Sequence, residues 1–232
     1  MTAIIPVLDE ESTLADCLTA LGGQEGLSEI VLVDGGSADG TERVAREAAA
    51  RLERTGIALR VIRSTKGRAS QMNAGAAMAA GDVLVFVHAD TRLPAGGVLS
   101  IARAIGEGYV GGAFRHRFVE RDARLAVVSW YANARSRLAG IFFGDQAIFV
   151  RRDLFERMGG FRPIPIMEDL EFTSRMRVAG RTLLLRTAVV TSARRFLADG
   201  IARTCLRLTL LRTAYRAGVD PSALAGRYRE IR

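Results

Sequence analysis

The stretch Glu29-Ile-Val-Leu-Val-Asp-Gly-Gly-Ser-Ala-Asp-Gly-Thr41 decides the fold of this chain. Its first half is an unbroken apolar run, which is typical of a strand buried on both faces of a parallel sheet. The glycines that follow allow a tight turn, and Thr41 is a candidate N-cap of a helix, whose free N–H groups can hold an anion. Taken alone, the stretch is equally well explained as a capped structural turn, because it matches neither a dinucleotide-binding fingerprint nor a P-loop.

The same alternation of apolar runs and helical stretches extends through the first 90 residues, and it predicts a parallel sheet with crossover helices. Strands are expected at residues 3–8, 29–33, 58–62 and 83–87, and each is apolar enough for burial on both faces. Helices are expected at residues 12–21, 40–55 and 69–80, with Ser12 and Thr41 as N-caps. The predicted fold class is therefore α/β, with a mostly parallel, Rossmann-like central sheet flanked by helices.

The second half of the chain is less regular, and it has no internal repeat or low-complexity linker. Strands are expected at residues 110–119, 146–151 and 182–190, and helices at residues 122–138, 153–158, 168–179 and 198–217. We expect residues 1–195 to form the α/β domain and residues 196–232 to form a basic C-terminal helical extension.

The positive charge of the chain lies at its C-terminal end. The 232 residues carry 33 basic and 25 acidic side chains, a formal net charge of +8, yet residues 1–180 sum to zero. A nucleic-acid-binding domain would carry basic residues along its main surface, so this asymmetry argues against that class of protein. It favours an appended region that faces an anionic partner or a membrane.

Cysteine usage and hydropathy indicate a cytoplasmic protein. Cys17 and Cys205 are far apart and form no CxxC pair, so they predict neither a disulfide framework nor a zinc site. The chain opens on a strand-like run without a signal peptide, and it has no stretch of about 18 uncharged apolar residues that would span a membrane. The expected location is the cytoplasm, with the inner face of the membrane as an option for the basic end.

Each carboxylate cluster of the first half follows the carboxyl end of a predicted strand. The clusters are Asp9-Glu10, Asp34 with Asp39, and His88-Ala-Asp90. Ligands of an open α/β sheet bind at that edge, so we expect the clusters to converge on one crevice. Asp90 is placed to hold a divalent cation that neutralises a diphosphate. One carboxylate is a weak metal site, however, and a lone histidine such as His88 is more often structural than a ligand.

A further pair of carboxylates, Glu168 and Asp169, stands at the start of a predicted helix, in the stretch Met167-Glu-Asp-Leu-Glu171. The helix dipole favours negative charge there, so ordinary N-terminal stabilisation explains the pattern by itself. The functional interpretation is a general base held on a rigid element.

Together these motifs resemble family 2 glycosyltransferases. The stretches that carry the resemblance, in the family's order and spacing, are Ile4-Ile-Pro-Val-Leu-Asp-Glu10, Val33-Asp-Gly-Gly-Ser-Ala-Asp-Gly-Thr41, Lys66-Gly-Arg-Ala-Ser-Gln-Met-Asn-Ala-Gly75, Phe86-Val-His-Ala-Asp90, Gly159-Gly-Phe161 and Glu168-Asp169. The resemblance covers residues 3–192. In finer detail, residues 88–94 and 144–152 are similar to a small stand-alone bacterial subgroup associated with arsenosugar biosynthesis.

The resemblance implies a GT-A fold, a nucleotide-diphosphate sugar donor, an acceptor hydroxyl, inversion at the anomeric carbon, and a divalent cation, Mn²⁺ or Mg²⁺. It implies that Asp169 is the catalytic base with Glu168 beside it, and that Asp90 is the metal ligand. The nucleotide-binding residues that it implies are Pro6, Asp9, Glu10, Asp34, Gly35, Ser37, Lys66, Arg68 and Asn73. The chain departs from the family's Asp-x-Asp metal motif because His88 replaces the first acid, so cation binding is expected to depend on the donor diphosphate.

The donor base and the acceptor are less closely defined. Asp34 suits the imide N–H of uracil, which slightly favours UDP, although guanine offers an N–H as well. The turn Gly144-Asp145-Gln146 is a candidate acceptor rim because it precedes the predicted base, and a plain strand-entry turn explains it equally well. Lipid-linked molecules are among the candidate acceptors. Two other functions stay open: a sugar nucleotidyltransferase, and a non-catalytic membrane-binding or partner-binding protein on a transferase scaffold.

The predicted C-terminal helix has two apolar edges. The edge expected to pack on the domain consists of Ile201, Cys205, Leu208, Leu211 and Tyr215. Leu206 and Leu210 lie about 180° away, on the side that holds Arg203 and Arg207. A second apolar edge flanked by arginines favours contact with a bilayer surface or with a second copy of the chain over a helix buried on both sides.

Overall fold

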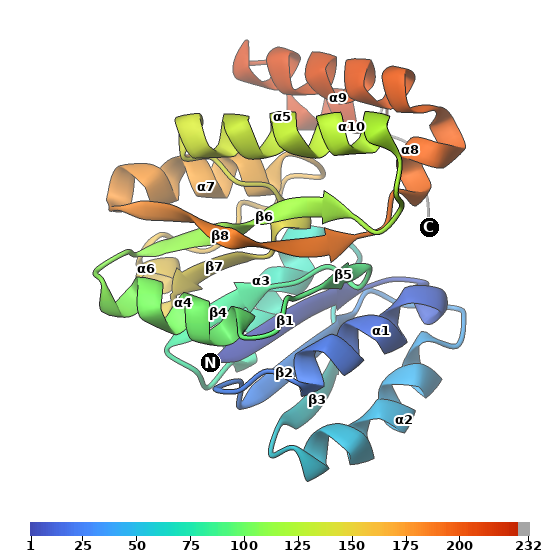
Figure 1. Ribbon diagram of the computed structural model, residues 1–232, viewed down its shortest axis with the longest axis vertical. Helices are drawn as coiled ribbons and strands as arrows, with labels where there is room; N and C mark the ends of the chain where they lie inside the picture. Colours follow the sequence, from blue (N-terminus) through green and yellow to red (C-terminus); the bar gives the residue numbers. More distant parts are fainter. Residues whose placement is uncertain (227–232) are drawn as a thin grey trace.

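The computed structural model describes residues 1–226 and contains one eight-stranded sheet flanked by helices (Figure 1). The strands are β1 (Thr2–Val7), β2 (Glu29–Asp34), β3 (Ala58–Arg63), β4 (Val83–Phe86), β5 (Thr91–Arg92), β6 (Gly111–Phe118), β7 (Ile148–Arg151) and β8 (Thr182–Thr191). The helices are α1 (Glu11–Gly22), α2 (Thr41–Arg54), α3 (Arg68–Met78), α4 (Gly97–Gly106), α5 (Ala123–Ala139), α6 (Arg152–Arg157), α7 (Glu168–Ala179), α8 (Arg194–Asp199), α9 (Ile201–Arg216) and α10 (Pro221–Ala225), with a short 3₁₀ helix η1 (Gly144–Gln146).

The strand order of the sheet is β3-β2-β1-β4-β7-β6-β8-β5. Strands β1 to β4 pair in parallel, whereas β7 runs antiparallel to both β4 and β6. β8 then pairs in parallel with β6 and antiparallel with β5. The predicted α/β architecture with a mostly parallel half is therefore confirmed.

Helices cover both faces of the sheet and bury its alternating side chains. In β1, Ala3, Ile5 and Val7 pack with α1, α2 and α4, while Ile4 points to the opposite face with α3, α6 and α7. The expectation of burial on both faces is correct for β1 and β2, which are buried throughout, but wrong for β3. β3 is the edge strand of the sheet, so one of its sides has no neighbour and most of its side chains are exposed.

Three local predictions need correction. Ser12 and Thr41 are not N-caps: the N-caps of α1 and α2 are Glu10 and Gly40, and the Thr41 hydroxyl instead accepts a hydrogen bond from the Glu10 N–H at 2.8 Å. Helix α4 and the two-residue strand β5 were not predicted. The helix expected at residues 198–217 is split into α8 and α9 at Gly200, whose φ of 85° interrupts helical geometry.

The C-terminal helices α9 and α10 lie beside α5, at the top of Figure 1. Leu211 of α9 and Leu224 of α10 pack against Ile166, Met167 and Leu170 at the start of α7. The boundary predicted near residue 195 thus falls inside α8. In residues 1–226, no helix combines the length and the apolar character that crossing a membrane requires.

Candidate active site

The carboxyl ends of β1 and β2 are joined by one glutamine. Gln71, buried on α3, donates through Nε2 to the carbonyl of Val7 at 2.8 Å and to that of Val33 at 2.9 Å. Gly35 passes close to this side chain, since an added Cβ would lie 3.0 Å from the Gln71 amide. These contacts fix the strand ends from which the predicted nucleotide-binding residues emerge.

The turn after β2 uses much of the hydrogen-bonding capacity of Asp34. Its Oδ1 accepts bonds from the N–H groups of Gly36 and Ser37, and from the Ser37 hydroxyl at 2.6 Å. Asp9 joins the same cluster, because its N–H donates to Ser37 Oγ and its Oδ1 accepts from Ala38. The predicted Asp9, Asp34 and Ser37 are therefore brought together in one hydrogen-bonded turn.

A cavity of about 160 Å³ lies at the carboxyl end of β1. The predicted site residues that line it are Pro6, Glu10, Lys66, Arg68 and Asp90. Asn73 is placed elsewhere: its amide bonds the backbone of Phe161 in both directions, at 2.8 and 2.9 Å. Asp9, Asp34, Gly35 and Ser37 are not among the lining residues of this cavity either.

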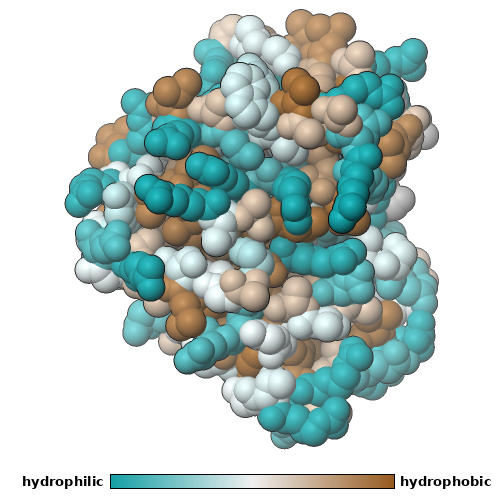
Figure 2. All heavy atoms as spheres, in the orientation of Figure 1, coloured by the Kyte–Doolittle hydropathy of each residue, from teal (hydrophilic) through white to brown (hydrophobic). Residues whose placement is uncertain are grey.

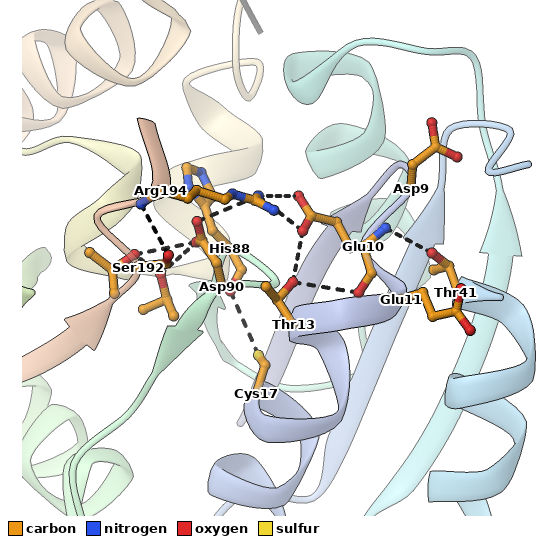
Figure 3. A network of polar contacts seen from close by, with 12 residues as sticks. Asp9, Glu10, Glu11, Thr13, Cys17, Thr41, His88, Asp90, Ser192 and Arg194 are labelled. Atoms are coloured by element: carbon orange, nitrogen blue, oxygen red, sulfur yellow. Dashed lines mark hydrogen bonds and ion pairs between the residues drawn. The ribbon is translucent and has the colours of Figure 1, made fainter. Parts of the chain in front are cut away.

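Sequence reasoning missed Arg194, which lines this cavity and joins two of the predicted acids (Figure 3). Its guanidinium donates to both carboxylate oxygens of Glu10, at 2.7 and 3.0 Å, and lies 3.6 Å from Oδ2 of Asp90. The hydroxyl of Thr191 donates to the other oxygen of Asp90 at 3.3 Å. The predicted metal ligand and a predicted nucleotide-binding acid therefore share one arginine from α8.

The two carboxylates at the start of α7 have different surroundings. Glu168 is 3% exposed, and its carboxylate lies 3.5 Å from Nε of Arg68. Burial raises the pKa of Glu168 to about 7, against the opposing charge of Arg68 and with support from the charge of Asp169. Asp169 is half-buried and accepts hydrogen bonds from the N–H of Gly144 at 2.9 Å and that of Leu170 at 2.6 Å. Its two oxygens are thus held in place.

Gly144 lies in close contact with both His88 and Asp169. A Cβ at this position would lie 2.5 Å from Nε2 of His88 and 3.7 Å from Oδ2 of Asp169, so the close contact needs glycine. His88 is buried, which lowers the pKa of its imidazole, and the charge of Arg68 lowers it further. Both effects favour the neutral form of the histidine that replaces the first acid of the family motif.

A second, larger cavity of about 250 Å³ adjoins the first. Arg68, His88, Asp90 and Arg194 line both cavities, whereas Asp169 lines the larger one. Gly144 and Asp145 of the predicted acceptor rim also line it, but Gln146 does not. Gln146 is 1% exposed, and its amide bonds Ser136, Phe143 and the Phe114 carbonyl inside the fold.

Another wall of the larger cavity comes from α5, which was predicted inside the α/β domain, and from α8 and α9, most of which were predicted in the C-terminal extension. Cys205 and Leu208 of the predicted packing edge face this cavity. The sequence did contain a signal for this wall, because arginines recur between apolar residues along these helices. Their place beside Glu168 and Asp169 depends on contacts between distant parts of the chain.

Comparison with known proteins identifies the class of protein that this fold and site define. The family model described as "Glycosyl transferase family 2" matches residues 2–161, which is more than half of the chain. The chain therefore belongs to glycosyl transferase family 2.

Similar proteins include the PGL/p-HBAD biosynthesis glycosyltransferase of Mycobacterium bovis, which is 31% identical over 74% of this chain and 67% of its own length. The beta-monoglucosyldiacylglycerol synthase of Trichormus variabilis is 21% identical over 77% of this chain and 41% of its own length. The chain spans from about two fifths to two thirds of the curated relatives it matches.

Among solved structures, the mannosyltransferase PcManGT of Pyrobaculum calidifontis, in complex with GDP-Man and Mn²⁺, has a TM-score of 0.70. It is 22% identical, and the alignment covers 100% of this chain and 65% of that one. This similarity supports the predicted GT-A fold.

Proposed function

We propose that this protein is an inverting glycosyltransferase that moves a sugar from a nucleotide-diphosphate sugar to an acceptor hydroxyl. The observation that carries the proposal is that two cavities meet at Arg68, His88 and Asp90, with Asp169 lining the larger of them. A donor in the smaller cavity and an acceptor in the larger one would meet beside the Asp169 carboxylate.

The smaller cavity has the chemistry that a nucleoside diphosphate requires. Lys66 and Arg68 supply positive charge for phosphate oxygens, and Pro6 offers an apolar surface. Asp34 lies at the neighbouring strand end, where its carboxylate can accept a bond from a base N–H. We retain UDP as the slightly favoured carrier, with GDP as the other candidate, since a structural neighbour is a complex with GDP-Man.

Asp90 would be the protein ligand of a divalent cation, Mn²⁺ or Mg²⁺. Residues 1–226 contain no group of three His, Cys, Asp or Glu side chains that could hold a metal ion, and Asp90 already faces Arg194. Asp90 would therefore supply one ligand, and the remaining ligands of the cation would come from the donor diphosphate. When bound, such a cation neutralises charge on the diphosphate.

Asp169 is the proposed general base. Its carboxylate removes the proton of the acceptor hydroxyl while that oxygen forms a bond to the anomeric carbon. The bond to the diphosphate breaks on the opposite face of the sugar, which inverts the configuration. Arg68, which lines both cavities, is placed to stabilise the charge that grows on the leaving diphosphate.

Thermal unfolding with a panel of nucleotide sugars tests this function. UDP-linked or GDP-linked sugars with Mn²⁺ should raise the melting temperature, since a ligand at 100 times its Kd adds about 2.7 kcal/mol of stability. Mn²⁺ without a nucleotide is the control. Conversion of a nucleoside triphosphate and a sugar phosphate with release of pyrophosphate would indicate a nucleotidyltransferase instead, and no nucleotide binding at all would indicate a non-catalytic protein.

Two finer assignments belong to the same proposal. The resemblance of residues 88–94 and 144–152 supports membership of the subgroup associated with arsenosugar biosynthesis. A lipid-linked acceptor is supported by the matching relative named as a synthase of a glucosylated diacylglycerol. A cytoplasmic site of action at the inner face of the membrane suits both the acceptor and the charge distribution of the chain.

We infer that the outer edge of α9 contacts a bilayer surface. Leu206 and Leu210 are 62% and 60% exposed, as the sequence predicts, and hydrophobic atoms lie over α9 at the top of Figure 2. On the neighbouring α5, Trp130 is 70% exposed. Arg203 is exposed, but Arg207 forms an ion pair with Asp199 and does not flank this edge as predicted, because α8 folds back beside it.

Replacing Leu206 and Leu210 together by glutamate should abolish binding to anionic liposomes, because both apolar contact and charge attraction are lost. Cosedimentation with vesicles that contain phosphatidylglycerol measures the effect, with exposed Arg137→Gln on α5 as a single-charge control. A change from dimer to monomer without any effect on vesicle binding would assign this edge to a subunit contact instead.

A further inference from the structure

The larger cavity has an apolar wall that sugar transfer by itself does not explain. Phe118 of β6, Val128 of α5, Phe196 of α8 and Leu208 of α9 all line it, together with Phe143 next to the acceptor rim. These side chains come from four elements that meet opposite the carboxylate of Asp169. A sugar or a small polyol would make few apolar contacts with this surface, so the wall fits a ligand with an apolar body.

Two arginines without acidic partners stand over the same wall. The guanidinium of Arg135 lies 4.1 Å from the ring centre of Phe143, and that of Arg212 lies 5.7 Å from it. Within residues 1–226, neither arginine has a carboxylate at ion-pair distance, and Nε of Arg135 is buried with no hydrogen-bond partner. Arg212 donates to the hydroxyl of Thr209 at 3.1 Å.

Burial of two like charges side by side destabilises the protein unless an anion binds to them. Burial, together with the like charge of Arg212, lowers the pKa of Arg135 to about 10. Burial likewise lowers the pKa of Arg212. The charge of Asp145 opposes this lowering of the pKa in both arginines, and the charge of Asp169 opposes it in Arg212. Neither carboxylate lies within ion-pair distance of these arginines. Two guanidinium groups turned to one cavity match the oxygen atoms of a phosphate or carboxylate.

We propose that Arg135 and Arg212 form an anion subsite for the acceptor, and that the acceptor is an amphipathic molecule with an anionic group and an apolar body. The inference rests on the proposed function, since it names the class of acceptor that the larger cavity takes. Phe143 links the subsite to the reaction centre, because the next residue, Gly144, donates its N–H to Asp169. The anionic group would anchor the acceptor while its hydroxyl faces the base.

Calorimetric titration of the full chain with octyl phosphate, inorganic phosphate and 1-octanol tests the subsite. Octyl phosphate should bind at least tenfold more tightly than either of the other two, because it alone combines the anion with an apolar body. Equal affinity for 1-octanol would overturn the anion subsite. Equal affinity for inorganic phosphate would overturn the amphipathic class of acceptor and indicate a site for free phosphate.

Substitution locates the subsite and separates its failure from that of the proposed function. Arg135→Gln and Arg212→Gln should each weaken octyl phosphate binding by about 10-fold to 100-fold, whereas Arg137→Gln, on the exposed side of α5, should leave it unchanged. Stabilisation by a nucleotide sugar with Mn²⁺ should persist in all three variants, which also shows that they are folded. Wild-type affinity for octyl phosphate in both substituted proteins would refute the subsite, while absence of nucleotide binding in the wild type would refute the function.

Discussion

Replacing Asp169 by asparagine should lower the turnover number for sugar transfer by about 10²-fold to 10⁴-fold, the contribution typical of a general base. Asparagine has nearly the same shape, and its side-chain oxygen can still accept the hydrogen bond that the Gly144 N–H donates at 2.9 Å. It cannot take up the proton of the acceptor hydroxyl. The measurement is the rate of nucleoside diphosphate release in the presence of saturating donor and acceptor.

The interpretation depends on separating chemistry from binding. Donor affinity and the midpoint of urea unfolding should match the wild type, because Asp169 lines the larger cavity and not the smaller one. A turnover number within threefold of the wild-type value, in a folded variant that binds donor normally, would show that Asp169 is not the base.

Replacing Glu168 by glutamine should change how stability depends on pH. Burial raises the pKa of this carboxyl from 4.5 to about 7, so between these values the folded protein holds a proton that the unfolded chain has released. The free energy of unfolding of the wild type therefore falls as pH rises through this window. The loss amounts to at most about 3 kcal/mol, because each pKa unit corresponds to about 1.4 kcal/mol.

Glutamine stays neutral at every pH, so the variant should gain stability relative to the wild type between pH 4.5 and pH 8. Urea unfolding at both pH values measures this difference. Glu156→Gln, at an exposed position of α6, is the matched control and should track the wild type. A constant difference between Glu168→Gln and the wild type at the two pH values would mean that Glu168 does not titrate in this window.

The parallel half of the fold could be predicted because its signals are local. Unbroken apolar runs mark β1, β2 and β4, and the acids at their carboxyl ends mark the crevice. The exposure of β3 had a signal in the sequence, because Arg60 and Arg63 interrupt its apolar run, whereas its edge position is a property of the strand order. Helix α4 carries Val98, Ile101 and Ala104 at helical spacing after two glycines, a signal that was available.

The site could be predicted where one motif holds the residues and not where distant segments meet. Glu10 and Arg194 are 184 positions apart, and no local pattern pairs them. The same holds for Arg135 and Arg212, which come together because α5 and α9 stack. Asn73 shows the opposite limit, since its motif is present while its amide secures the backbone of Phe161.

The place of β8 in the sheet has a consequence for biosynthesis. β5 pairs with β8, and β6 pairs with β8 along most of its length. In the described part of the chain, β6 pairs with β7 only through Gly111 and Gly112. A ribosome adding about 5–20 residues per second needs roughly 4–15 s to extend the chain from the end of β6 to the end of β8. Throughout that interval both earlier strands expose unpaired backbone edges, which are templates for aggregation. Both edges are therefore covered only once β8 has been synthesised.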